Sequence, residues 1–475
     1  MLALALLGAC ATEAASPPAG VDFQGDELDP SDDLGDEIDE PIAPDTGLNG
    51  DEAPTSDQVV EAAITDVEAF WQRTYEDVYG EPYQPISGGF WAYGPESEQP
   101  PCGTPPPSYA EIAENAFYCP SDDLVAWDDV NLIPQLYDEF GGFTLGIVFA
   151  HELGHAIQTR AGTAGPTVLL ELQADCFAGA WSRDVEQGNS EFFELTVQDL
   201  DKAVAGFLEL RDGVGVAAGD PAAHGTGFDR IGSFVDGYEQ GAGFCATYPD
   251  RLESGDLVVV EVPFTDPDDF ERGGNLPLSE LLPSLTEDLD NFWSLLFQER
   301  GEEWTSVDVV RVDPDTDVVE CGEDTYRGAS LVNASFYCVA SDTIYIDEVH
   351  LIPTLDEIGD YAVATEIARQ YAFAAQERLG IDDSTLATNL NADCLTGVYA
   401  SSGFLGNRQD RGQALFLSPG DLDEAVIAFL LHSDANEDVD ADDGDVSVGT
   451  AFERFDAYRD GFLSGTDACD ALLGD

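Results

Sequence analysis

Lysine is almost absent from this chain of 475 residues, whose only lysine is Lys202. Its 17 basic residues stand against 96 Asp and Glu residues, so the formal net charge is −79. Proteins bind nucleic acids and anionic lipid headgroups through clustered Lys and Arg, and a surface of this charge repels both ligands. Salt at about 1 M shortens the range of repulsion between carboxylates to ~3 Å. We therefore interpret the composition as adaptation to a saline setting rather than as a specific acidic function, and we expect no nucleic-acid partner.

A membrane-spanning run is missing from the start of the chain, where the apolar stretch Leu2–Leu7 is too short to cross a bilayer. The following residues, Leu7–Cys10, resemble a bacterial lipobox, in which cleavage leaves Cys10 as the lipidated N-terminus. The basic residues that usually precede such a run in a signal peptide are missing. Two alternatives therefore stay open: the signal peptide begins farther upstream, or the resemblance is accidental. We expect residues 1–10 to be a lipoprotein signal peptide. The protein would then be exported to the cell envelope and held by Cys10 at the outer face of the cytoplasmic membrane.

Aromatic residues are nearly absent from residues 11–56, which are rich in Asp, Glu, Pro and Gly. Such a composition buries too little apolar surface to fold, so we expect a flexible acidic tether. The hydrophobic fraction of the whole chain is nevertheless 43%, which is typical of globular domains.

Histidine is also scarce, and two of the five His residues lie in one motif, HELGH, within an apolar run predicted to be a helix. Residues four apart share a helix face, so His151 and His155 can bind one metal ion, with Glu152 beside them. Zinc needs neutral nitrogen ligands, an open position for water and a nearby base. The alternative, a helix with two incidental histidines, is less favoured because polar groups in an apolar helix need partners.

An internal repeat organises most of the chain. AFYCPSDDLVAWDDVNLIP at Ala116–Pro134 matches SFYCVASDTIYIDEVHLIP at Ser335–Pro353, and ELQADCFAG matches NLNADCLTG farther on. The repeat predicts two copies of one unit of about 190 residues. We place the first copy at 57–250 and the second at 251–475. The connecting stretch GDLVVVEVPF, residues 255–264, is predicted to be a β-strand. We leave open whether this strand belongs to the first or the second copy.

Cysteine usage follows the repeat. Of the nine cysteines, eight remain when Cys10 is set aside, four in each copy at matching places. Even pairing in an exported chain points to disulfides, although buried thiols at Cys176 and Cys394 are an alternative. Four cysteines allow three connectivities, of which we favour Cys102–Cys119 and Cys176–Cys245, repeated as Cys321–Cys338 and Cys394–Cys469.

The second copy has lost the HELGH residues. Alignment of the two helices pairs His151 with Arg369, Glu152 with Gln370, and His155 with Phe373. Arginine stays protonated, Gln is no base, and Phe has no lone pair to offer. We therefore expect one Zn²⁺ per chain, in the first copy, and no metal site in the second.

The same alignment indicates a third metal ligand. Glu171, in ELQAD on the next predicted helix, corresponds to Asn389 in the second copy. Glu171 would complete a His-His-Glu set with water in the fourth position. The alternative is an exposed helix carboxylate.

Two further residues are candidates near the metal. His224, in HGTGFDR, corresponds to Val448, so the imidazole was lost together with the metal ligands; we hypothesise that it holds the developing oxyanion or orients a ligand, against a simple surface histidine. Asp175 persists as Asp393, so it either braces a ligand histidine or is structural. Four other residues are interpreted as scaffold or surface positions: Arg230, Arg454, His350 and His432.

HELGHAIQ followed by ELQADCFAGAW, with FYC upstream and HGT downstream, resembles the bacterial neutral zinc metallopeptidase family, a zincin-like group. The resemblance covers about residues 66–245. It implies an α+β fold in which the active-site helix packs under a small sheet, with His151, His155 and Glu171 as zinc ligands and Glu152 as the catalytic acid/base. Zincins commonly bind substrate along an edge strand, for which Leu124–Asp128 is our candidate. The second copy departs from the family at every catalytic position.

The expected function is an envelope-anchored or secreted zinc peptidase acting on a peptide or protein substrate. Glu152 would take the proton of the attacking water, and the metal, with His224 as a candidate partner, would hold the oxyanion. The alternative is a non-catalytic cell-surface binding or scaffold protein on the same fold. The second copy would either shape or cover the cleft of the first, or hold a partner of unknown identity.

Overall fold

The computed structural model describes residues 54–216, 224–264, 267–381, 385–408, 412, 415–431 and 448–473. Cys10, the predicted signal peptide and His432 lie outside these residues, as does most of the predicted tether. The last residue of that tether, Ser56, instead begins the first helix. In the described residues, no helix combines the length and the apolar character needed to cross a membrane.

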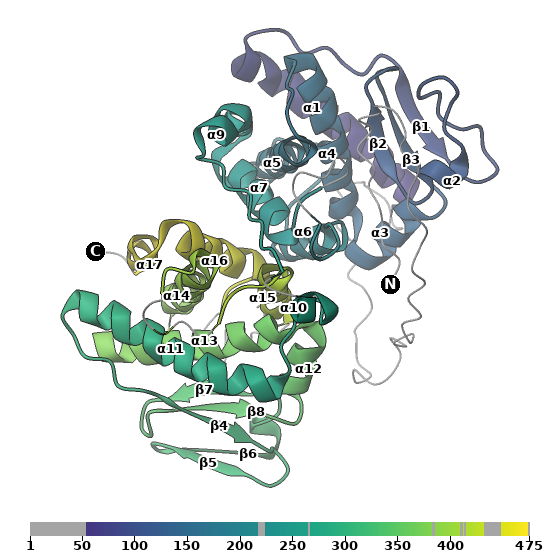
Figure 1. Ribbon diagram of the computed structural model, residues 1–475. Helices are drawn as coiled ribbons and strands as arrows, with labels where there is room; N and C mark the ends of the chain where they lie inside the picture. The colour runs from purple at the N-terminus through teal and green to yellow at the C-terminus, as the bar shows by residue number, and fades with distance from the viewer. Residues whose placement is uncertain are drawn as a thin grey trace.

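The N-terminal half, here residues 54–254, consists of helices and one small sheet that lies at their side (Figure 1). Its elements are α1 (Ser56–Tyr79), β1 (Gly89–Tyr93), α2 (Tyr109–Ile112), β2 (Ala116–Cys119), β3 (Leu124–Asp128), α3 (Leu132–Phe140), α4 (Gly142–Ala161), α5 (Thr167–Glu186), α6 (Val197–Glu209), α7 (Gly227–Gln240), α8 (Ala242–Cys245) and α9 (Tyr248–Ser254).

The C-terminal half, here residues 278–473, follows the short α10 (Pro267–Glu271) and has the same order of strands and long helices. Its elements are α11 (Leu278–Arg300), β4 (Asp308–Val312), β5 (Val318–Cys321), β6 (Asp324–Arg327), the 3-10 turn η1 (Gly328–Ser330), β7 (Ser335–Cys338), β8 (Thr343–Asp347), α12 (Leu351–Ile358), α13 (Asp360–Leu379), α14 (Leu386–Leu405), α15 (Asp421–Leu431), α16 (Ala451–Ser464) and α17 (Thr466–Leu472). The predicted mixed α+β class is confirmed.

The two halves build their three-stranded sheets alike. In the N-terminal half the strand order is β1-β3-β2, with β3 parallel to β1 and antiparallel to β2. In the C-terminal half β8 is central, parallel to β4 and antiparallel to β7, and a separate hairpin β5-β6 is added. The prediction that Leu124–Asp128 is an edge strand is therefore wrong. All five of its residues are buried, because a central strand is covered on both faces and paired on both edges.

The long helices of the N-terminal half pack on one another, and α4 also lies against the sheet. α4 is buried along most of its length and packs against β2, α1 and α5. α5 in turn lies against α7 at the points where Gly179 and Gly237 face the other backbone: a Cβ on Gly179 would overlap the carbonyl oxygen of Phe234, and one on Gly237 that of Cys176. Gly397 and Gly461 make the same close approach between α14 and α16. Only a residue without a side chain permits this spacing.

All four favoured disulfides are confirmed. Cys102–Cys119 ties the loop after β1 to the end of β2, and Cys176–Cys245 ties α5 to α8, with Cα atoms 5.9 and 5.6 Å apart. Cys321–Cys338 and Cys394–Cys469 repeat the two sequence separations closely, 17 and 75 against 17 and 69 residues. Each long-range bridge holds a helix against the C-terminal end of its half.

The sheets lie at opposite ends of the molecule, and the halves meet through α6, α7, α15 and α16 (Figure 1). The contact is reciprocal. Asp201 on α6 accepts hydrogen bonds from the backbone N–H groups of Ala451 and Phe452, the first residues of α16. Asp423 on α15 accepts the N–H of Phe228 in the first turn of α7. Each half thus caps a helix of the other, where the helix dipole favours a carboxylate.

The connection between the halves corrects a second prediction. Residues 255–264 form no strand, although their apolar run is typical of one. The backbone N–H of Val260 donates instead to the carboxylate of Asp229 on α7, 3.1 Å away. A side chain therefore takes the bond that a neighbouring strand would have provided.

Candidate active site

The HELGH residues lie in the middle of α4, on the face turned toward α5. His151 and Glu152 are 4% and 3% exposed, and His155 is half-buried. The two imidazoles stand one helical turn apart, with ring centroids separated by 4.8 Å and their Nε2 atoms by 3.2 Å. The helix thus points both Nε2 atoms at one place, as the spacing predicted.

Glu171 joins them from α5. Its Oε2 lies 3.3 Å from His151 Nε2, and its Oε1 lies 3.6 Å from His155 Nε2. Tetrahedral zinc with ligands at about 2.0–2.1 Å holds those ligands about 3.3 Å from one another. The separations among these three residues therefore fit one zinc ion, and the three form a buried group of potential metal ligands.

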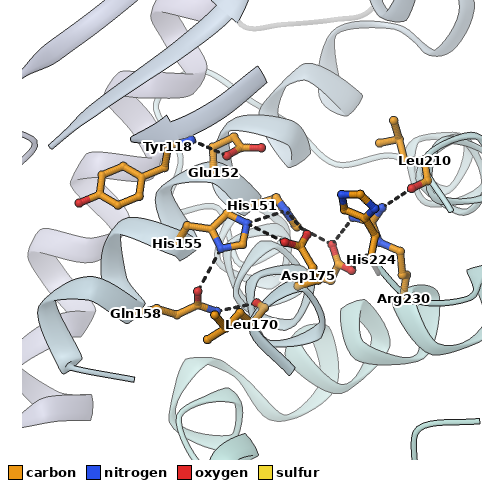
Figure 2. Close-up of polar contacts among 12 residues, drawn as sticks. Tyr118, His151, Glu152, His155, Gln158, Leu170, Asp175, Leu210, His224 and Arg230 are labelled. Atoms are coloured by element: carbon orange, nitrogen blue, oxygen red, sulfur yellow. Dashed lines mark hydrogen bonds and ion pairs between the residues drawn. The ribbon is translucent and has the colours of Figure 1, made fainter. Parts of the chain in front are cut away.

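The hydrogen bonds around the two rings fix their tautomers. His151 Nδ1 lies 2.7 Å from Asp175 Oδ1, and an ionised carboxylate only accepts, so Nδ1 carries the proton (Figure 2). His155 Nδ1 lies 3.0 Å from Gln158 Oε1, while the amide nitrogen of Gln158 donates to the carbonyl of Leu170. Both Nε2 atoms therefore present lone pairs. Together with the Glu171 carboxylate, three acceptors converge when the rings are neutral, an arrangement that a metal cation or an added proton would compensate.

Electrostatics agrees with this arrangement. Burial opposes a charge on His151, but Asp175, Glu171 and Glu152 outweigh it and raise its pKa to about 10. Burial likewise disfavours ionised Glu171, but the two histidines outweigh it and lower its pKa to about 2. The buried carboxylates around His151 thus favour a positive charge at this place.

Glu152 lies beside the three and toward the sheet. Its Oε2 accepts the backbone N–H of Tyr118 on β2, 2.8 Å away, which orients the carboxylate (Figure 2). Burial raises its pKa, against the opposing effect of the two histidines. A buried carboxylate with a raised pKa is suited to take up and release a proton.

Asp175 contacts both a histidine of HELGH and a buried arginine. Besides His151 it binds Arg230, whose Nε and Nη2 donate to Oδ2 and Oδ1 at 2.8 and 2.9 Å. Arg230 is 1% exposed and also donates to the carbonyl of Leu210. The Arg230–Asp175 pair thus joins α7 to α5 and orients His151 at the same time.

His224 lies just before α7 and is not one of the three clustered residues. Its Nδ1 lies 3.1 Å from Asp212 Oδ1, and Asp212 Oδ2 accepts the backbone N–H groups of His224 and Gly225. Figure 2 draws His224 next to Arg230, on the side of the site away from Tyr118 and Glu152. The carboxylate of Asp212 therefore orients the ring of His224.

Three neighbours were not assigned a role from the sequence: Tyr118, Gln158 and Asp212. The spacing of Gln158 could have identified it, since it follows His155 by three residues on the same helix face. However, the matching position in the second helix is also a glutamine, Gln376, which indicates a structural role. Tyr118 acts through its backbone, which no side-chain pattern reveals. Asp212 lies in a loop, where no periodicity guides prediction.

The corresponding place in the C-terminal half is closed by an arginine. Arg369, at the position of His151, donates from Nε to Asp393 Oδ1 at 2.7 Å and from Nη2 to Asn389 Oδ1 at 3.1 Å. Its guanidinium also lies 4.9 Å from the ring centre of Phe373. Arg369 thereby contacts the counterparts of Asp175, Glu171 and His155. Its positive charge occupies the position at which the three candidate ligands converge in the N-terminal half. His350 is exposed, 44% for its side chain, as predicted.

A cavity of about 280 Å³ opens next to the His224 loop. Its lining includes Asp212 and Gly225 from that loop, Val260 and Phe264 from the connection, and residues 418–420 from the C-terminal half. Val168, one turn before Glu171 on α5, also contributes. The C-terminal half therefore supplies part of the wall of a cavity that borders the candidate site.

Residues 39–248 match the family model described as "Putative neutral zinc metallopeptidase". The protein YpfJ of Escherichia coli K12 is 28% identical over 221 residues, 41% of this chain and 70% of that protein. The proteins Mb2605 of Mycobacterium bovis and Rv2575 of Mycobacterium tuberculosis H37Rv are each 29% identical over 217 residues, 40% of this chain and 69% of theirs. All three are described only as uncharacterized proteins. No solved structure gave a significant match. The likeness to zinc metallopeptidases covers the part of the chain that holds the site.

Proposed function

We propose that the N-terminal half is a zinc-dependent peptidase in which His151, His155 and Glu171 hold one metal ion. The observation that carries the proposal is the convergence of three lone-pair donors within 3.2–3.6 Å of one another, with the outer nitrogen of each ring already engaged. Zinc held there supplies Lewis acidity, which makes water a competent nucleophile near neutral pH. The match of residues 39–248 to a zinc metallopeptidase model supports the same metal.

Glu152 is the proposed general base. The Tyr118 N–H holds one carboxylate oxygen, leaving the other to take a proton from the attacking water and later deliver it to the leaving amine. Asp175 keeps the His151 proton on Nδ1 throughout, so the ring nitrogen facing the metal stays unprotonated. His224, oriented by Asp212, is proposed to hold the oxyanion that forms from the peptide carbonyl. Because Nδ1 faces the Asp212 carboxylate, this role requires a proton on Nε2 as well, which would donate to the oxyanion.

A peptide or protein substrate is proposed to bind along β2 rather than along β3, which the sequence favoured. Within the described sheet β2 pairs on one side only, with β3. The other side of β2 carries the Tyr118 N–H that donates to Glu152, so a chain added there would pass the catalytic carboxylate. An extended segment can join such an edge through main-chain hydrogen bonds.

Export of the protein and a lipid anchor on Cys10 are proposed as well. The four disulfides support an oxidising compartment, since such bridges persist outside the cytosol. We also infer that the halves arose by tandem duplication, with the metal site lost in the second. The repeated strand order, disulfides and glycine contacts support this history.

A binding or scaffold function is the second candidate, and the C-terminal half favours it. There Arg369 fills the metal position with bonds to Asp393 and Asn389, so this frame is stable without zinc. The N-terminal half could then serve mainly to bind a partner. Metal content and turnover together separate the two candidates.

The test uses the full chain, its metal content and a mixed peptide library whose products are identified by mass spectrometry. We expect one zinc per chain and cleavage that is lost in Glu152→Gln by about 10³-fold or more, with zinc retained. The matched control is Glu209→Gln, the same change at an exposed position on α6, which should leave both readouts unchanged. Zinc-free protein, or unchanged turnover in Glu152→Gln, would contradict the proposal.

A further inference from the structure

Three buried carboxylates meet in the C-terminal half, far from HELGH in sequence. Asp360 begins α13, and Asp421 and Glu424 lie in the first turn of α15. They are 6%, 4% and 8% exposed, and one oxygen from each lies within 4.8 Å of the others. Like charges this close in a dry place repel strongly unless a cation or a proton intervenes.

Each of the three side chains is fixed by a backbone N–H on one oxygen only. Leu276 donates to Asp360 Oδ2 at 2.9 Å, Ser418 to Asp421 Oδ2 at 2.8 Å, and Tyr361 to Glu424 Oε2 at 2.9 Å. The remaining oxygens of Asp360 and Asp421, Oδ1 in both, are buried and have no hydrogen-bond partner in the described part of the chain. The carboxylates are therefore oriented by the backbone with their free oxygens left unsatisfied.

None of the three carboxylates forms an ion pair with Arg, Lys or His in the described residues. Arg211 pairs instead with the neighbouring Asp423, at 3.1 Å, and only partly offsets the rise in the pKa of Glu424. Asp269, 3% exposed, adds repulsion to Asp360 and Asp421. Burial, followed by the neighbouring acids, raises the pKa of Asp360 to about 6 and that of Glu424 to about 8.

The N-terminal half has a cation at the same place. Alignment of DLDKAV with DLDEAV puts Lys202 opposite Glu424, and Gly142 stands opposite Asp360. Lys202 Nζ lies 3.8 Å from where a Cβ on Gly141 would be, and the Glu424 carboxylate lies against the equivalent Gly359. The ammonium group of Lys202 thus occupies in the N-terminal half the place that the Glu424 carboxylate occupies in the C-terminal half. There, two further carboxylates lie close to Glu424.

A cavity of about 20 Å³ borders the cluster, lined in part by Asp360 and Asp421. A volume of this size accommodates about one water-sized particle.

We propose that Asp360, Asp421 and Glu424 bind a calcium ion that joins the start of α13 to α15. All the available donors are oxygens, which hard cations prefer to zinc's nitrogen and sulfur ligands. Calcium–oxygen distances of about 2.3–2.6 Å span oxygens up to about 5 Å apart, and calcium tolerates irregular sets of ligands, whereas magnesium demands a near-ideal octahedron at about 2.1 Å. The sequence predicted no metal in this half because its counterpart of the HELGH site is lost; this site lies elsewhere.

Calcium at this site would stabilise more than one helix. Asp360 also connects to the segment before α11, through the Leu276 N–H and through Asn275, whose Oδ1 accepts the Asp360 N–H at 2.7 Å. Asp423, the neighbour of Glu424 on α15, caps α7 of the other half. Fixing α15 therefore holds both the C-terminal core and the contact between the halves.

The experiment uses full-length, zinc-loaded Glu152→Gln protein, which excludes self-cleavage, in metal-stripped buffer of constant high KCl. Calcium bound after equilibrium dialysis is measured by elemental analysis, and the melting temperature is followed against added calcium. We expect one calcium per chain and a rise in Tm of several degrees at about 1 mM Ca²⁺. No bound calcium with a flat Tm would overturn the site. An equal response to Mg²⁺ would overturn the choice of calcium.

Three variants locate the effect. Asp421→Asn should weaken calcium binding about tenfold or more, because it removes one charge and one ligand. Glu424→Lys brings in the residue of the other half, so it should fold in metal-stripped buffer and lose the calcium response. The matched control, Asp199→Asn, changes the N-terminal counterpart of Asp421 and should keep the response. Calcium binding that persists in both C-terminal variants would refute the proposal, whereas zinc content and peptidase activity test the other site separately.

Discussion

Single residues distinguish the proposed zinc site from the matching place in the other half. His151 and Arg369 occupy matching places on α4 and α13, and each is bound by an aspartate from the following helix, Asp175 or Asp393. The aspartate has the same geometry in both cases, so its partner determines the chemistry. A neutral imidazole oriented by Asp175 offers a lone pair, whereas a guanidinium carries a permanent charge and leaves no place for a metal ion.

His224 provides the prediction at the residue scale. His224→Ala should lower kcat by about 10²-fold with KM and zinc content little changed, because an oxyanion donor acts mainly in the transition state. The change would be measured with a peptide found in the library digest. His350→Ala, at an exposed histidine in the other half, is the control and should have no effect. Activity of His224→Ala near that of the control would remove His224 from the mechanism.

At the scale of elements, the reciprocal caps join the halves. Asp201 accepts two N–H groups at the start of α16, and Asp423 accepts one in the first turn of α7 and pairs with Arg211. Phe228 then packs on Phe455 across the contact, with ring centres 5.6 Å apart. The two caps are made from aligned positions of α6 and α15, so one sequence pattern is used twice.

Removing either cap should loosen the contact between the halves. Asp201→Ala leaves the first N–H groups of α16 without a partner in a buried place, at a cost of about 1–2 kcal/mol in the free energy of unfolding. Denaturant unfolding at fixed calcium would measure this cost. Glu209→Ala, an exposed acid on the same helix, should cost less than about 0.5 kcal/mol. Equal effects of the two changes would show that the cap contributes nothing.

At the scale of the whole molecule, carboxyl groups are numerous enough that some are buried without full compensation. Burial, with Asp423 adding repulsion, raises the pKa of Asp229 to about 7 from its ordinary 3.8. Burial, with Glu239 and Asp460 nearby, raises that of Asp456 to about 7 as well. Both lie on helices at the contact between the halves, α7 and α16.

These shifts predict a pH dependence of stability. A carboxyl whose pKa is higher in the folded than in the unfolded state binds its proton more tightly when folded, so its contribution is complete below pH 3.8 and is lost as the pH rises through about 7. The melting temperature at fixed calcium should therefore fall between pH 5 and pH 8, and Asp229→Asn should reduce the fall. Molar KCl should raise Tm at pH 8, since it screens exposed carboxylates. A Tm independent of pH in this range would contradict the assignment.

Much of the proposed zinc site could be predicted from the sequence because its signals are local or repeated. HELGH specifies one helix face by its spacing alone, and comparison of the two similar segments singled out Glu171, which aligns with Asn389. The cysteine pairing followed from matched spacing in the same way. These inferences needed only residue order and helix geometry, which a chain carries in one dimension.

The tertiary structure alone decided which residues meet. LVAWD and GDLVVVEVPF both have the composition of strands. The first, β3, is the central strand because β1 pairs with it on the side away from β2. In the second, the backbone N–H of Val260 donates to Asp229 and not to a neighbouring strand. The cluster of Asp360, Asp421 and Glu424 was also invisible, since each is an ordinary acid among 96 until α13 and α15 are packed together. Strand neighbours and buried charge depend on contacts between segments far apart in sequence, and only the folded chain brings those segments together.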